Sequence, residues 1–102
     1  MTDRLRDTLE NLPNRPGVYH YYNRQGQLLY VGKAKDIAKR VSSYWQSTSW
    51  RTAWTQLMIA EIDDIQIVEV KTELEAIMLE NSLIKSLKPK YNLQLKDDKT
   101  FP

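Results

Sequence analysis

Two tyrosines and a lysine in the first third of the chain have the types and spacing to build a polar site. Tyr19 ends a Gly-Val-Tyr triplet, and eleven residues later Tyr30 and Lys33 bound the segment Tyr-Val-Gly-Lys. Both segments are typical of β-strands, and the polar residues 23–26 between them predict a hairpin turn. Two phenols beside an ammonium group could form a site. An ordinary aromatic pair across two strands would use the same residues.

The length of the turn predicts the register of this hairpin. A four-residue loop pairs Tyr22 with Gln27. That pairing places Tyr19 directly opposite Tyr30 on one face of the ladder, with Cβ atoms about 5 Å apart. His20 alternates with Tyr19, so we expect it on the opposite face as an ordinary strand residue.

One carboxylate near the end of the chain stands where helical periodicity predicts an apolar side chain. The neighbours of Glu80 at three and four residues' distance are Ala76, Ile77, Leu83 and Ile84. A carboxylate that is buried without a partner costs several kcal/mol. We therefore expect Glu80 to pair with Arg40 or a lysine, to be protonated, or to bind a cation in a functional site.

Length and composition predict one domain and exclude several kinds of chemistry. The chain has 102 residues, 41% hydrophobic and 27% charged, which suits a single modest core. It has no cysteine, which excludes disulfides, thiolate metal sites and a cysteine nucleophile. The charged N-terminus does not resemble a signal peptide, and the apolar runs are too short to span a bilayer. We therefore expect a cytoplasmic protein without contact to membranes.

The net charge of +2 hides an uneven distribution along the chain. Residues 33–51 carry +4, residues 61–80 carry −6 and residues 85–99 carry +3. Two basic blocks separated by an acidic one predict a surface for a polyanion. A solvated surface of mixed charge would have the same composition.

The elements that must position these residues follow from periodicity, capping residues and turns. We expect strands at residues 17–22, 27–32 and 65–70, and helices at residues 2–11, 36–45, from about 50 onward, and 72–87. Asp36 is a plausible N-cap, and Thr72 with Glu75 forms a capping box. Pro89 should end the last helix.

Two of the predicted helices have a face that we expect to be buried. In the helix after Asp36 the buried residues would be Ile37, Val41, Tyr44 and Trp45. In the next helix they would be Trp50, Ala53, Trp54, Leu57 and Met58. Helical spacing of the tryptophans favours core packing over stacking on nucleic-acid bases.

Seven short motifs, in order over essentially the whole chain, resemble the GIY-YIG nuclease family. Within it they resemble the N-terminal domain of bacterial excinuclease C subunits. The motifs are Leu12-Pro13, Pro16–Tyr19, Tyr30–Lys35, Arg40–Tyr44, Leu79–Lys85, Lys88–Asn92 and Leu95–Lys99. Val18 and Val31 stand where the family name has isoleucine. The resemblance implies an α/β (α+β) fold with a small three-stranded antiparallel sheet flanked by helices. It also implies that residues 1–102 are a single domain at the start of a longer protein.

The resemblance implies a metal-dependent nuclease site. Glu80 would hold one divalent cation, magnesium or manganese, acting as a Lewis acid and template. The scissile phosphate would be surrounded by Tyr19, Tyr30, Lys33, Arg40, Tyr44 and Asn92. Arg40 would offset charge on the phosphorus, Tyr30 is our choice as general base, and Tyr19 would orient. A free phenol has a pKa of about 10, so ionisation at neutral pH needs nearby positive charge, from Lys33 and the metal.

The resemblance also implies a substrate and partners. The reaction would be incision on the 3′ side of a lesion in nucleotide excision repair, on damaged double-stranded DNA held by the excinuclease B subunit. No small-molecule substrate is implied. Nucleic-acid-binding residues would be Lys33, Lys35, Lys39, Arg40, Lys88, Lys90 and Asn92, and Gly17 and Gly32 would be structural. Affinity of the domain alone for DNA should be weak, salt-sensitive and nearly blind to sequence.

Three alternatives stay open. One is a sequence-specific GIY-YIG restriction or homing endonuclease, although 102 residues leave little room for an arm that reads bases. Another is a nucleic-acid-binding module with an inactive site. The third is an interaction domain in which Glu80 merely pairs with Arg40.

Overall fold

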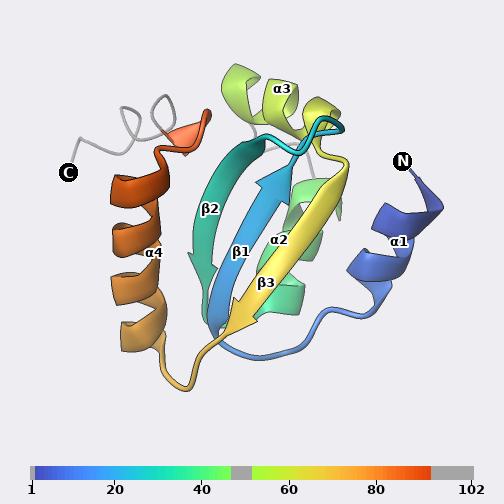
Figure 1. Ribbon diagram of the computed structural model, residues 1–102. Coiled ribbons are helices and arrows are strands. Elements are labelled where there is room, and N and C mark those ends of the chain that lie inside the picture. The colour runs from blue at the N-terminus through green and yellow to red at the C-terminus, as the bar shows by residue number, and fades with distance from the viewer. Residues whose placement is uncertain (1, 47–51, 93–102) are drawn as a thin grey trace.

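The sheet has three antiparallel strands, as the family resemblance implies, and their order across the sheet is β2 (Leu28–Ala34), β1 (Gly17–Tyr22) and β3 (Asp64–Glu69). The structure, a computed structural model, describes residues 2–46 and 52–92. In chain order the elements are α1 (Asp3–Glu10), β1 (Gly17–Tyr22), β2 (Leu28–Ala34), α2 (Ile37–Gln46), α3 (Ala53–Glu61), β3 (Asp64–Glu69) and α4 (Glu73–Leu87). The four helices flank the sheet, with α4 standing apart from the other three (Figure 1).

The hairpin of β1 and β2 has a different register from the predicted one. Tyr19 lies opposite Gly32, and Tyr30 lies opposite Tyr21, so the expected pairing of Tyr19 with Tyr30 is wrong. Leu29 has no partner in the ladder, which makes it the extra residue of a β-bulge. The shift at Tyr19 is two residues. Because side chains alternate with a period of two, Tyr19 and Tyr30 still share one face of the sheet.

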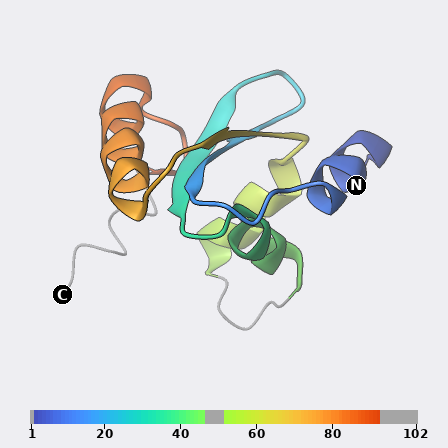
Figure 2. The same ribbon diagram turned by 90° about the horizontal axis from the view of Figure 1, so that it is seen from below.

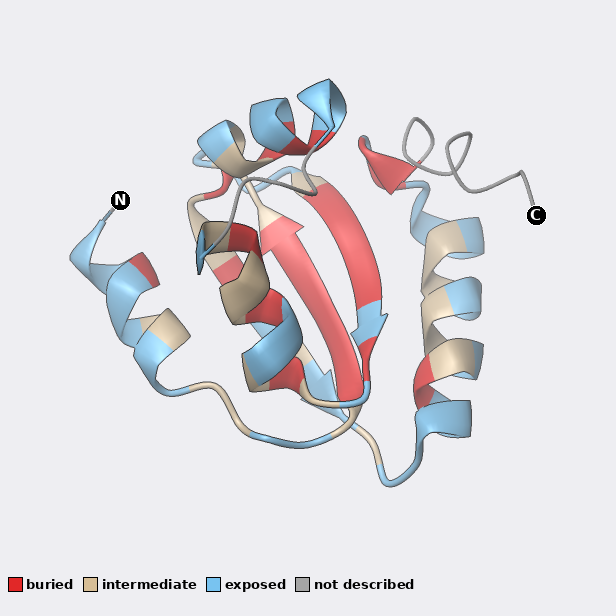
Figure 3. Ribbon diagram, turned by 180° about the vertical axis from the view of Figure 1, so that it is seen from behind, coloured by how far each residue is buried: buried red, intermediate tan, exposed pale blue. Residues whose placement is uncertain are grey.

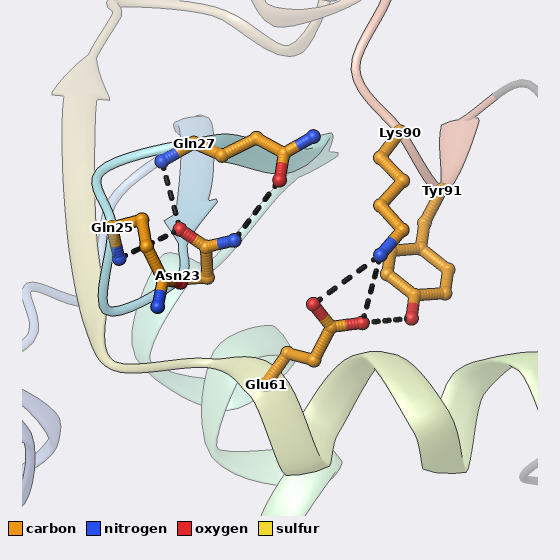
Figure 4. Close-up of polar contacts among 6 residues, drawn as sticks. All are labelled: Asn23, Gln25, Gln27, Glu61, Lys90 and Tyr91. Atoms are coloured by element: carbon orange, nitrogen blue, oxygen red, sulfur yellow. Dashed lines mark hydrogen bonds and ion pairs between the residues drawn. The ribbon is translucent and has the colours of Figure 1, made fainter.

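The turn between β1 and β2 is shorter than the four-residue loop predicted from the sequence, and this explains the wrong register. The backbone N–H of Asn23 donates to Gln27 O at 3.0 Å, so these two residues close a loop of only three residues. The side-chain Oδ1 of Asn23 accepts from the backbone N–H groups of Gln25 and Gln27, at 3.0 and 2.8 Å (Figure 4). Gly26 has φ of 85°, the left-handed conformation that this loop requires.

Each face of the sheet is covered by different helices. The face that carries Tyr19 and Tyr21 packs on α2 and holds the larger core, which also includes Leu5 of α1 and Met58 of α3. The opposite face packs on α4 through a small cluster of Val18, Val31 and Ala76. The view from below separates the two layers (Figure 2). Buried residues concentrate on β1, β2 and the inner side of α2, whereas most of α4 is exposed or half-buried (Figure 3).

The capping predictions are confirmed by the hydrogen bonds at two helix starts. Asp36 Oδ1 accepts from the backbone N–H of Lys39 at 3.1 Å, which makes Asp36 the N-cap of α2. Thr72 Oγ1 accepts from the backbone N–H of Glu75 at 3.1 Å, and Glu75 in turn accepts from the N–H of Lys71 at 3.2 Å. These contacts fix the starts of the two helices that carry Arg40 and Glu80.

The buried face predicted for α3 is confirmed at Met58 and is wrong at Ala53, Trp54 and Leu57. Thr55 and Met58 are buried, whereas Trp54 is 43% exposed and Leu57 is 54% exposed. The predicted residue Trp50 lies outside the described residues. The helix is apolar on several sides, so periodicity alone could not identify the face that meets the core.

Within residues 2–46 and 52–92, none of the helices has the length and apolar character needed to cross a membrane.

Candidate active site

Three phenols from different elements meet in the core beneath α2. Tyr19 of β1 and Tyr44 of α2 share a hydrogen bond between their hydroxyls at 2.8 Å. The ring centroids of Tyr19 and Tyr30 lie 6.2 Å apart. All three side chains are buried, with at most 4% of their surface exposed. The predicted grouping of these tyrosines therefore forms, although through a different strand register.

Arg40 lies at the rim of this tyrosine cluster. Its guanidinium carbon is 5.3 Å from the centroid of the Tyr44 ring, one helical turn further along α2. The positive charge of the guanidinium lowers the pKa of the Tyr19 hydroxyl. Burial, together with the nearby Tyr30, raises the pKa of Tyr19 well above its ordinary value, and Arg40 and Tyr44 offset only part of that rise. Tyr19 is thus a neutral phenol at physiological pH.

Gly32 leaves the space that Tyr19 occupies. Tyr19 lies opposite Gly32, and a Cβ at position 32 would overlap Cζ and the hydroxyl of the Tyr19 ring. At Gly17 a Cβ would lie 2.6 Å from Cδ1 of Ile37 and would also overlap the carbonyl oxygen of Val68. Both glycines of the motif therefore have a steric reason to lack a side chain.

Glu80 joins α4 to the end of β2. Its carboxylate is half-buried, and Oε2 accepts a hydrogen bond from the backbone N–H of Lys33 at 3.1 Å. The sequence left open an ion pair between Glu80 and the side chain of Arg40 or a lysine. In the structure the partner of Glu80 is instead the backbone N–H of Lys33. The contact explains how a carboxylate is accommodated one turn from the buried Ala76.

The donor set around Glu80 fits a hard divalent cation. The described residues contain no group of three or more His, Cys, Asp or Glu side chains that could cage a metal. Mg²⁺ keeps several waters and is commonly held by one or two carboxylates together with substrate phosphates. A single carboxylate oriented by a backbone N–H suits that mode and does not suit a zinc cage.

The first basic block forms one surface beside Glu80. Four of its five cationic residues, Lys33, Lys35, Lys39 and Arg40, are exposed, and the fifth, Arg51, lies outside the described residues. These four line a hollow of about 510 Å³ that lies between the β2–α2 junction and the first turns of α4. Lys35 also pairs with Glu73 of α4, at 3.3 Å. Within the described residues, the structure therefore brings together the four predicted basic residues from Lys33 to Arg40.

The second basic block is arranged differently. Lys90 Nζ pairs with Glu61 of α3 at 3.2 Å, and Lys88 is an exposed C-cap residue with φ of 45°. Asn92 is only 4% exposed, and both of its amide atoms bond the backbone of Val31, so its amide group is engaged with the protein rather than presented to a phosphate. No local pattern in the sequence marks Glu61 as a partner of Lys90, because the two residues are about thirty positions apart.

Comparisons with known proteins identify the family of this chain. Residues 15–93 match the model of the UvrC-like GIY-YIG domain. The UvrABC system protein C of Chlorobium luteolum is 49% identical over 96% of this chain, and that of Wolinella succinogenes is 50% identical over 99%. The matches span 16% and 18% of those relatives, so the chain corresponds to less than a fifth of their length.

Solved structures extend the agreement to the fold. The GIY-YIG N-terminal endonuclease domain of UvrC from Thermotoga maritima, bound to its catalytic magnesium, has a TM-score of 0.78 and 36% sequence identity. The match covers 90% of this chain and 99% of that one. A tyrosine-to-phenylalanine point mutant of the same domain, also bound to its catalytic divalent cation, has a TM-score of 0.79 at 35% identity, covering 90% and 98%. The chain therefore belongs to the UvrC-like GIY-YIG domain family.

Proposed function

We propose that this domain is a metal-dependent DNA endonuclease that hydrolyses a phosphodiester on the 3′ side of a lesion in nucleotide excision repair. The observation that carries the proposal is the placement of Glu80. Its carboxylate is oriented by Lys33 N–H at the end of β2, beside a basic hollow. The solved relatives of this fold are endonuclease domains bound to a catalytic divalent cation, which supports the same use of the site here.

Glu80 would hold the cation, magnesium or manganese. When bound, the cation supplies Lewis-acid stabilisation of charge on the phosphate. The protein's own part is to fix the carboxylate through Lys33 N–H and to bind phosphate oxygens with Arg40 and the Lys33 ammonium. Donors that are already in place cost little reorganisation when charge develops during the reaction.

The two tyrosines would divide the remaining work. Tyr19 shares a hydrogen bond with Tyr44, and its raised pKa opposes loss of a proton, which supports an orienting role. Tyr30, on the strand that carries Lys33, remains our choice as general base for the attacking water. If Tyr30→Phe kept incision near the wild-type rate while Tyr19→Phe lost it, these roles would be reversed.

Damaged double-stranded DNA is the proposed substrate, and the excinuclease B subunit is the proposed partner. The relatives are proteins of the UvrABC system, which supports both assignments and a cytoplasmic location. Lys35 and Lys39 line the same hollow as Lys33, where they would contact phosphates that flank the scissile one. Contacts of this kind give salt-dependent affinity with little sequence preference.

A metal-binding experiment tests the proposal before any reconstitution of repair. Mn²⁺ binding to the domain can be followed by electron paramagnetic resonance, in the wild type and in Glu80→Gln. We expect the substitution to weaken Mn²⁺ binding at least about tenfold and to abolish incision in the assembled system. Glu75→Gln is the matched control, because a capping box accepts glutamine as well as glutamate.

Two results would contradict the proposal. The first is Mn²⁺ affinity that is unchanged in Glu80→Gln, which would place the cation elsewhere. The second is DNA binding without metal dependence and without incision in any variant, which would favour the binding module with an inactive site.

A further inference from the structure

Asn92 acts on the backbone of the strand that carries the candidate site residues. Its Oδ1 accepts from Val31 N–H at 2.8 Å, and its Nδ2 donates to Val31 O at 3.0 Å. Val31 lies between Tyr30, the candidate base, and Gly32, over which the Tyr19 ring packs. The side chain thus satisfies both backbone groups of one residue at the outer edge of β2.

The residue before Asn92 continues this pairing. The backbone N–H of Tyr91 donates to Leu29 O at 2.8 Å, so the segment runs along β2 as a neighbouring strand would. Lys88, with φ of 45°, ends α4 in the left-handed conformation, and the buried Pro89 follows it. The chain between α4 and Asn92 is therefore short, and its position depends on what holds Tyr91.

The end of α3 supplies that anchor. The Tyr91 hydroxyl donates to Glu61 Oε2, and the Lys90 ammonium lies 3.2 Å from the same oxygen (Figure 4). Lys90 Nζ also lies 5.2 Å from the centroid of the Tyr91 ring, and Trp54 packs against that ring at 6.5 Å. One carboxylate therefore collects two donors from consecutive residues of the segment.

The Tyr91 phenol is suited to this contact at neutral pH. Burial and the adjacent Glu61 raise the pKa of Tyr91 to about 12, so it stays a protonated donor. The hydrogen bond from Tyr91 holds the pKa of the Glu61 carboxyl below its usual range, so the acceptor stays charged. Hydrogen bonds to a charged acceptor are stronger than neutral ones.

We propose that Glu61 and Tyr91 are positioning residues, which hold Asn92 on Val31 and thereby set the backbone between Tyr30 and Lys33. The contact runs from the last residue of α3, through the segment after α4, to the strand beside Glu80. The positional part of this inference stands on geometry alone. Its catalytic consequence rests on the proposed nuclease function.

Amide hydrogen exchange of Val31 tests the positional part directly in the 102-residue chain. In Tyr91→Phe, which removes only the hydroxyl, we expect Val31 N–H to exchange at least tenfold faster than in the wild type. Tyr22→Phe is the matched control, since this tyrosine lies on the other side of the sheet and stacks on His20, and it should leave the rate unchanged. Asn92→Ala removes both side-chain hydrogen bonds to Val31 and therefore gives the largest increase in exchange rate to expect.

Glu61→Gln and Glu61→Ala are a second pair of variants, which test the same hydrogen bond without a change at Tyr91. Glutamine keeps an acceptor oxygen and should restore part of the protection that alanine loses. In incision assays with the assembled repair proteins, Tyr91→Phe should lower kcat about tenfold with the KM for DNA and the Mn²⁺ affinity unchanged. That pattern separates a positioning effect from lost binding.

The results that would overturn the inference are distinct from those against the nuclease function. If Val31 N–H exchanged at the wild-type rate in the folded variants Tyr91→Phe and Glu61→Ala, the hydrogen bond between Tyr91 and Glu61 would not be what holds Asn92. Faster exchange with unchanged kcat would remove the catalytic consequence. If the wild type makes no incision, the proposed function fails, and the exchange measurement still decides the positional part.

Discussion

The two faces of the sheet place their polar groups in opposite ways. Beneath α2, phenols are the core itself, and Tyr19 and Tyr44 are at most 2% exposed. Beneath α4 the core is small and aliphatic, and the carboxylate of Glu80 stands half-buried at its border. We conclude that on the first face a change in a candidate site residue alters stability and activity together. On the second face a change at Glu80 should alter activity almost alone.

The two faces also differ in the direction of their response to pH. Burial raises the pKa values of Tyr19, Tyr21 and Tyr44 on the α2 face well above the ordinary value of a phenol. On the opposite face burial lowers the pKa of His20, and a backbone hydrogen bond with Gln66 offsets part of that shift. The first face keeps these three phenols neutral and the second keeps His20 neutral, so the first should weaken in alkali and the second in acid.

The largest expected effect is the loss of stability in alkali. Tyrosines of the unfolded chain ionise near pH 10, while the buried phenols resist ionisation, so the free energy of unfolding should fall as pH rises above 10. Each buried phenol contributes up to about 1.4 kcal/mol per pH unit. Guanidinium unfolding between pH 9 and 11.5 measures the slope, which should be shallower in Tyr44→Phe than in the wild type. An equal slope in both would show that the phenol of Tyr44 ionises freely in the folded state.

A smaller effect is expected from filling the space at Gly32. Gly32→Ala forces the Tyr19 ring to move, and overpacking of this kind costs about 1–3 kcal/mol. Ala76→Gly, in the α4 cluster, is the comparison, because it costs about 1 kcal/mol through helix propensity and about 0.8 kcal/mol through the buried methyl that it removes. Thermal unfolding of both variants shows which substitution destabilises the protein more. If Gly32→Ala were as stable as the wild type, the close contact between Tyr19 and the strand would be refuted.

The smallest effect is expected in acid. The folded state holds His20 neutral, so stability is complete above the ordinary histidine pKa of about 6.5 and is lost as pH falls toward the lowered value. One group contributes up to about 1.4 kcal/mol per pH unit. His20→Asn should remove this part of the slope between pH 7 and 5, measured by urea unfolding. An unchanged slope would assign the acid response to the carboxylates instead.

Much of the fold could be predicted from the sequence, because its signals are local. Asp36 and the pair of Thr72 and Glu75 mark helix starts through contacts three residues apart. The bulge at Leu29 and the buried side of α3 could not be predicted in this way. A bulge shows only once two strands pair, and an evenly apolar helix acquires its inner face from its neighbours.

For the candidate site, the sequence likewise identified residues but not the partners that they contact. Glu80 stood out because a carboxylate among apolar neighbours requires a partner, but the partner is a backbone N–H, which has no residue type to recognise. Asn92 was expected at the phosphate because of the family resemblance, and the structure places its side chain against the backbone of Val31. The contact between Glu61 and Tyr91 spans thirty residues and depends on the tertiary fold alone.

The segment that carries Tyr91 and Asn92 also has a consequence for solubility. A strand at the edge of a sheet exposes backbone groups that can pair with another chain and start aggregation. Along β2 the outward groups of Leu29 and Val31 are taken by Tyr91 and Asn92. The strand that holds Tyr30 and Lys33 is therefore shielded from intermolecular pairing by the same residues that fix its position.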